Sequence, residues 1–146
     1  MPQGDPVELV VGSEGTLAVV ASVTLDLAPV PEATALALVA VHGADDIASV
    51  LEAAAALDAS ACEFFGRRFL EITSMSSHPM VGPTVADAEA AFLIEVDGPI
   101  DEVADGLEAL RRLGHELGSP AITAAESADR EVLWEIRHAA SPLVAA

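Results

Sequence analysis

The residues most able to do chemistry begin with a short glycine-containing stretch near the start of the chain. The stretch consists of Gly12, Ser13, Glu14, Gly15, Thr16 and Leu17. Glycine adopts positive φ at no steric cost and lets a ligand approach the backbone closely, so the stretch is a candidate ligand-binding turn. An ordinary hairpin turn explains the same spacing. A phosphate-binding P-loop is excluded, because no lysine follows Gly15 and that motif needs its positive charge.

A second candidate is Arg137, which lies three residues after the single tryptophan, Trp134. A guanidinium group binds a carboxylate through two parallel hydrogen bonds, and Arg137 shares a helix face with Ser141, four residues on. A lone arginine on an exposed helix more commonly forms a surface salt bridge. Trp134 is expected to anchor the core, with its indole N–H bound to one acceptor. From the residues alone, both interpretations of Arg137 stay open.

We expect structural roles for the remaining reactive side chains. The histidines lack any metal-ligand spacing, so we expect surface or half-buried imidazoles and no metal site. Cys62 leads an apolar run, which favours a small buried thiol over a nucleophile. The paired arginines are expected to form salt bridges in an acidic protein. These residues are His42, His78, His115, His138, Arg67, Arg68, Arg111 and Arg112.

Composition limits the classes of partner. The chain has 146 residues, the size of one ordinary domain, and 6 basic against 24 acidic residues give a net charge of −18. Such a surface repels phosphate backbones and anionic lipid, so we expect neither nucleic acid nor a membrane surface as partner. The start of the chain lacks the charge and apolar run of a signal peptide, and no apolar run approaches the length of a membrane span. The expected compartment is the cytoplasm.

Hydrophobic periodicity predicts an alternation of strands and helices after a leading hairpin. Prolines at 29 and 31 mark a boundary between the two parts, because each removes a strand hydrogen-bond donor. Residues 74–88 are expected to form a long exposed loop. The expected strands are 8–11, 17–27, 34–41, 61–65, 90–96 and 121–124, and the expected helices are 47–57, 67–73, 100–117 and one that starts at Ser127 and points Leu133, Trp134 and Ile136 inward.

This order predicts an α+β fold of the ferredoxin-like kind, with an antiparallel or mixed sheet and helices on one face. In the helix over 100–117, the apolar residues Ile100, Val103, Leu107 and Leu110 fall on one face, and Gly118 provides a stop. The leading segment is expected to form a β-hairpin before this domain.

In context, residues 5–27, DPVELVVGSEGTLAVVASVTLDL, resemble the end of the flavin-binding domain in FAD-linked oxidases of the vanillyl-alcohol oxidase superfamily. The branch most similar holds glycolate oxidase, D-lactate dehydrogenase and D-2-hydroxyglutarate dehydrogenase. In that branch a G-S-E-G-T-L-G segment passes along the FAD, largely through its backbone. The resemblance therefore implies that residues 12–17 contact FAD, with Ala18 in place of the usual last glycine.

Two further stretches resemble the same family. Residues 133–137, LWEIR, are similar to its L-W-x-x-R signature, in which the arginine reaches the carboxylate of a 2-hydroxy acid. The resemblance implies that Arg137 and Ser141 contact such a substrate, while the flavin takes a hydride from the carbon that bears the hydroxyl. Residues 63–68, EFFGRR, are similar to the family's E-x-x-D-R stretch, although Gly66 replaces the aspartate.

The resemblance also implies a division of the chain. Residues 1–31 would be a remnant of the FAD-binding domain and residues 32–146 a truncated substrate or cap domain. The family's flavin subdomain and its H-x-G-D-G-N-x-H region would lie outside this sequence. We therefore expect a fragment that is inactive alone, retains no FAD, pairs with the flavin subdomain and is prone to self-association. The alternative is a stand-alone ferredoxin-like module that binds a small ligand or dimerises.

Overall fold

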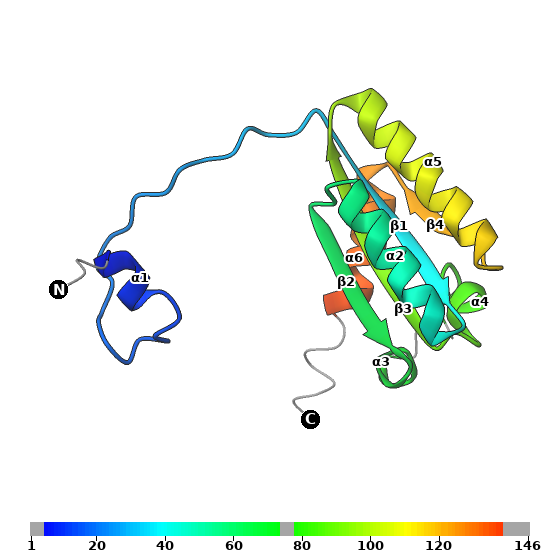
Figure 1. The fold of residues 1–146 in the computed structure, drawn as a ribbon, viewed down its shortest axis with the longest axis horizontal. Coiled ribbons are helices and arrows are strands. Elements are labelled where there is room, and N and C mark those ends of the chain that lie inside the picture. The colour runs from blue at the N-terminus through cyan, green and yellow to red at the C-terminus, as the bar shows by residue number, and fades with distance from the viewer. Residues whose placement is uncertain (1–4, 74–77, 139–146) are drawn as a thin grey trace. The chain divides into compact units, whose positions relative to one another are not determined.

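A computed structural model describes residues 5–73 and 78–138, and the chain divides into two compact units, residues 1–30 and 31–146. The first unit contains one short helix, α1 (Pro6–Val10). The second contains β1 (Ala33–Val41), α2 (Ala44–Ala56), β2 (Ala61–Gly66), α3 (Arg67–Ile72), α4 (Gly82–Val85), β3 (Ala90–Gly98), α5 (Ile100–Glu116), β4 (Ile122–Ala124) and α6 (Ser127–His138). Figure 1 shows these elements along the chain.

The leading hairpin is a wrong prediction. Asp5 accepts a hydrogen bond from the Val7 N–H at 2.9 Å, and Pro6 occupies the first helical turn, so the chain starts a helix where a strand was expected. Residues 17–27 form no strand in the described structure. Their β-branched side chains favour extended backbone, but a strand also needs a partner strand, which residues 5–30 do not supply.

In the second unit, four strands form one antiparallel sheet in the order β2-β3-β1-β4. The central pair is the longest, with Leu38 of β1 opposite Leu93 of β3. Ile122 of β4 faces Leu38 from the other side, and β2 pairs along β3 at the opposite edge. This arrangement confirms the predicted ferredoxin-like α+β fold.

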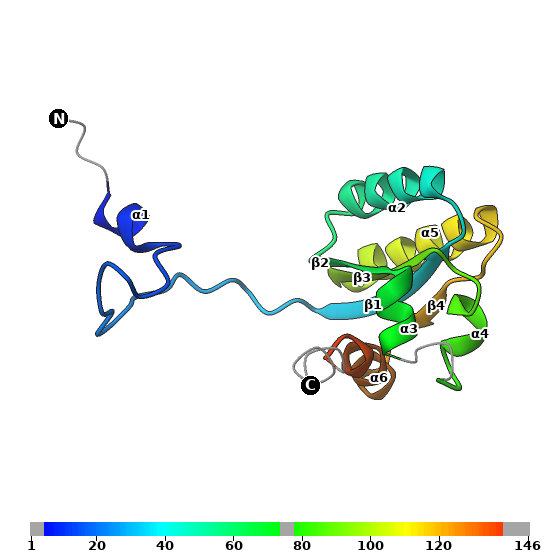
Figure 2. The ribbon, with the colours of Figure 1, turned by 90° about the horizontal axis from the view of Figure 1, so that it is seen from below.

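Helices cover both faces of the sheet, where the sequence predicted one (Figure 2). α2 and α5 pack on one face, while α3, α4 and α6 contribute buried residues to the other. β1 requires this arrangement, because residues 35–41 are apolar at every position and a strand exposes alternate side chains to opposite faces. Of the loop expected over 74–88, residues 74–77 lie outside the described structure, and the prediction for residues 78–88 is corrected, since Val81 and Val85 are buried against the second face.

The longest helix, α5, follows its predicted spacing over most of its length. Val103, Leu107 and Leu110 are buried against the sheet, whereas Ile100 is 65% exposed at the first turn. The helix ends at Glu116, and Gly118 adopts φ of +78°, which favours glycine. Just before this end, Gly114 lies in close contact with the backbone of residues 119–121, and its carbonyl accepts a hydrogen bond from the Ser119 N–H at 2.9 Å.

A pair of glycine substitutions in α5 tests this packing. A Cβ at Gly114 would lie 2.6 Å from the Ala121 backbone nitrogen, whereas a Cβ at Gly106 would make ordinary contacts from 3.6 Å. Gly114→Ala should lower the free energy of unfolding by about 1–3 kcal/mol through overpacking. Gly106→Ala should raise it by up to about 1 kcal/mol through helix propensity. Urea unfolding measures both free energies, and equal effects would contradict the close contact of Gly114 with residues 119–121.

Candidate functional site

The candidate site is built on α6, which packs across the second face of the sheet. Leu133, on the side of the helix that faces the sheet, is 1% exposed and belongs to the apolar cluster of that face. At the start of the helix, the Arg130 guanidinium donates to the Thr34 carbonyl of β1 at 3.0 Å and to the Ala125 carbonyl. These contacts join α6 to the ends of β1 and β4. The last turns of α6 contact β3 and β2 through side chains.

Trp134 fixes the position of α6 along the sheet. Its indole N–H donates to Glu95 Oε2 of β3 at 3.2 Å, which confirms the single acceptor predicted for it. The Ser60 hydroxyl donates to Glu95 Oε1 at 3.2 Å. Both oxygens of the Glu95 carboxylate therefore have donors, and this carboxylate is held in one orientation between a loop and a helix.

Arg137 lies one helical turn after Trp134 and faces β2. Its Nε is 3.5 Å from Glu63 Oε2, and the two side chains are 40% and 38% exposed. In the sheet, Ala61 pairs with Glu95 and Glu63 pairs with Leu93, so the two glutamates occupy the same face two residues apart along the ladder. The structure thus brings together one guanidinium, one indole and two carboxylates.

The sequence predicted only part of this cluster. Arg137 and Trp134 were recognised, whereas Glu95 was missed and Glu63 was noticed only within a family-like stretch. A signal was available: Glu63 is the one charged residue in β2 and Glu95 directly follows the apolar run 90–94 of β3, where a charge needs a partner. Ser141 lies outside the described residues, as does the side chain of Ile136.

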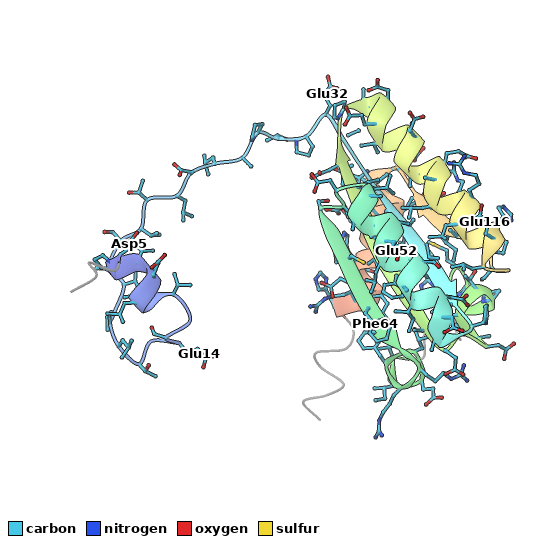
Figure 3. The ribbon with its side chains drawn as sticks, viewed as in Figure 1. Asp5, Glu14, Glu32, Glu52, Phe64 and Glu116 are labelled. Carbon is cyan, nitrogen blue, oxygen red and sulfur yellow. The ribbon has the colours of Figure 1, made fainter. Side chains whose placement is uncertain are left out.

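The glycine-containing turn belongs to the first unit. Gly12, Glu14 and Gly15 have φ of +78°, +49° and +77°, the left-handed region that favours glycine. The Thr16 N–H and hydroxyl both donate to the Ser13 carbonyl, at 2.9 and 2.7 Å, and close the turn. A Cβ at Gly12 or Gly15 would meet nothing within 4 Å, so both glycines have open space beside the backbone. Figure 3 shows Glu14 on this exposed loop.

Beside the turn, the first unit presents an apolar surface. Valines of α1 and of residues 20–23 line a hollow of about 470 Å³. The exposed large side chains include Val19 at 94% and Leu27 at 89%. An apolar surface of this extent is typical of a segment that contacts another protein surface.

Other cations and imidazoles have local roles in the structure. Arg67 pairs with Glu71 at 3.0 Å, and Arg111 pairs with Glu108 at 3.5 Å, which confirms salt bridges for these two arginines. The ring of His138 stacks on Trp134 with centroids 6.3 Å apart. Over residues 5–73 and 78–138, no three histidine, cysteine or acidic side chains gather as metal ligands.

Cys62 is exposed, which corrects the prediction of a buried thiol. It lies on β2, an edge strand, opposite Ile94 of β3. The neighbouring Phe64, labelled in Figure 3, is 54% exposed, so the helices leave this edge partly open. Partial burial, followed by the charge of Glu63, raises the pKa of the Cys62 thiol, which makes it a poor nucleophile.

The raised pKa of Cys62 predicts how alkylation depends on pH. The midpoint of the iodoacetamide rate profile should lie higher in the folded chain than in the urea-unfolded chain. The folded thiol keeps its proton longer, so the free energy of unfolding should fall as pH rises from the unfolded pKa through the folded one. Glu63→Gln should lower the folded midpoint, and Glu71→Gln should not. A folded midpoint at or below the unfolded one would refute this account.

The Trp134–Glu95 contact is tested by a double-mutant cycle. Glu95→Ala should lower the free energy of unfolding by about 1–2 kcal/mol and change Trp134 fluorescence, because the indole N–H loses its acceptor. Glu95→Gln keeps an acceptor for the indole and should lose less stability than Glu95→Ala. Glu52→Ala, an exposed change on α2, should stay within about 0.5 kcal/mol of wild type. If Glu95→Ala costs as much with Trp134→Phe as without it, the two residues are not coupled.

Comparison with known proteins adds one family. Residues 30–146 match the family model described as FAD linked oxidases, C-terminal domain. No curated protein matches the chain. Among the residues that the structure describes, no helix is long and apolar enough to cross a membrane.

Proposed function

The chain belongs to the family of FAD-linked oxidase C-terminal domains, and we propose that it forms the substrate-side domain of a flavoenzyme that oxidises a 2-hydroxy acid. Family membership makes the parent protein an FAD-linked oxidoreductase. Within it, we assign the chain to the branch of glycolate oxidase and D-lactate dehydrogenase. The assignment rests on the similarity of residues 133–137 to that branch's signature and on the surroundings of Arg137.

The observation that carries the proposal is that Arg137 already faces a carboxylate at 3.5 Å in a half-exposed position. A guanidinium offers five N–H donors in a planar fork, so donors remain for a ligand carboxylate. α6 is fixed beneath Arg137 by Leu133 and by the Trp134–Glu95 hydrogen bond. An arginine on a fixed helix turn binds a small anion at a lower entropic cost than one on a mobile loop.

In this proposal Arg137 holds the substrate carboxylate, and Ser141, which the family resemblance assigns to the substrate, adds a hydroxyl contact. Trp134 keeps the helix turn in register through its hydrogen bond to Glu95. Residues 12–17 hold FAD through their backbone: their positive φ angles and the open space at Gly12 and Gly15 fit a flat ligand's approach. Bound FAD supplies the chemistry of hydride acceptance.

The proposed division of the chain places residues 1–31 with the flavin-binding domain and 32–146 with the substrate domain. The boundary between the compact units at residues 30 and 31 supports it, as does the start of the family match at residue 30. The exposed valines and leucines of the first unit would then pack against the remainder of the flavin domain.

Substitution of Arg137 in the FAD-loaded enzyme that carries this domain tests the proposal. Arg137→Ala should lower kcat/KM for glycolate and D-lactate roughly 10- to 150-fold, since a charged hydrogen bond contributes about 1.5–3 kcal/mol. Arg137→Lys should recover little, because an ammonium group lacks the planar fork. The loss of a half-exposed ion pair should reduce stability by less than about 1 kcal/mol.

The control is Arg112→Ala, which removes an exposed arginine from α5 and should leave turnover unchanged. Thermal unfolding is measured on every variant. Unchanged kcat/KM in Arg137→Ala would show that this arginine binds no substrate. A loss of stability as large as that of Trp134→Ala would show that its role is structural.

A further inference from the structure

On the basis of the proposed function, we propose that Glu63 is a specificity-determining residue: it occupies Arg137 until a ligand carboxylate displaces it, and it favours ligands that carry a single carboxylate. The juxtaposition that carries this inference is Glu63 against the guanidinium of Arg137, with Glu95 two residues along the ladder on the same sheet face. This role of Glu63 narrows the proposed substrate class to monocarboxylates, because 2-hydroxy acids include both mono- and dicarboxylic acids.

The two glutamates differ in their freedom to move. Glu95 accepts from Trp134 through one oxygen and from Ser60 through the other, so it is held in place. The side-chain contact of Glu63 in the described structure is with Arg137, at 3.5 Å, and its side chain is 38% exposed. A ligand carboxylate can therefore displace Glu63 into solvent without breaking the contacts that hold α6.

The charges at the site then limit what can bind. Glu63, Glu95 and Arg137 sum to one net negative charge before any ligand arrives. A monocarboxylate replaces Glu63 on the guanidinium, and the displaced carboxylate remains tethered nearby on β2. A second carboxylate on the ligand would meet the displaced Glu63, and the residues that pair in this cluster, Trp134, Glu95, Glu63 and Arg137, include no second guanidinium or ammonium to neutralise it.

The expected size of the effect follows from Coulomb's law near a protein surface. One like charge a few ångströms beyond contact distance weakens binding by about three- to tenfold at low salt. The exposed Glu63–Arg137 pair itself, which a ligand must break, corresponds to about two- to fivefold in affinity. Removing the charge of Glu63 should therefore help a monocarboxylate modestly and a dicarboxylate more.

The experiment follows the side-chain Nε–H resonance of Arg137 by NMR in the 146-residue chain at constant low ionic strength. The probes are glycolate, with one carboxylate, tartronate, with two, and glycolamide, which is uncharged. Wild type should bind glycolate more tightly than tartronate and should not bind glycolamide. Glu63→Gln should tighten glycolate binding about two- to fivefold, and tartronate binding by that factor times a further factor of about three to ten.

Three further variants separate the possible outcomes. Glu63→Ser removes the same charge and replaces Glu63→Gln if that variant misfolds. Glu71→Gln removes a carboxylate that also pairs with an arginine, at 3.0 Å, and should change no affinity. Arg137→Ala should abolish the binding of both acids, as judged by amide shifts of α6 and β2.

The contrary results separate the role of Glu63 from the proposed function. If Arg137→Ala abolishes binding but Glu63→Gln leaves both affinities unchanged or weaker, the role of Glu63 is overturned and the proposed function stands. If Arg137→Ala binds glycolate as wild type does, the proposed function fails. Saturable binding in neither wild type nor Glu63→Gln overturns both.

Discussion

Strand β1 has no side that faces solvent, and the architecture of the second unit follows from that constraint. Residues 35–41 are at most 1% exposed, and they alternate between the apolar clusters of the two sheet faces. A strand of this kind is stable only between two layers of cover. α2 and α5 supply one layer, and α3, α4 and α6 supply the other (Figures 1 and 2).

The candidate site is a consequence of the second layer. α6 covers the sheet with Leu133, and its last turns reach two glutamates, Glu95 of β3 and Glu63 of the edge strand β2. Each has a partner: the Trp134 indole N–H donates to Glu95, and the Arg137 guanidinium forms an ion pair with Glu63. The Trp134–Glu95 hydrogen bond sets the register of the helix, and so positions the arginine proposed to bind substrate.

Local sequence signals predicted most of the second unit and little of the first. The apolar run of β1 and the periodicity of α5 identify buried elements wherever tertiary contacts agree with local preference. The hairpin was wrong because β-branched residues 17–27 favour extended backbone but lack a ladder, while Asp5 and Pro6 begin a helix. The helices α3 and α6 were expected, but local patterns do not say which sheet face a helix covers, and α4 lies in a stretch without periodicity.

The candidate site was likewise predicted only in part. Arg137 and Trp134 were identified from a short signature, and the structure adds what a signature does not contain, the partners on β2 and β3. Strand register decides that Glu63 and Glu95 share a face, and register is a property of the folded sheet. Cys62 was expected to be buried because its neighbours are apolar. Its strand lies at the sheet edge, which a local pattern does not reveal.

The most direct measurement of the central claim is a crystal structure of the FAD-loaded enzyme that carries this domain, with glycolate bound. The glycolate carboxylate should lie on the Arg137 guanidinium, with Glu63 turned away from it and the Trp134–Glu95 hydrogen bond unchanged. Glycolate bound at another place, with Arg137 still paired to Glu63, would contradict it.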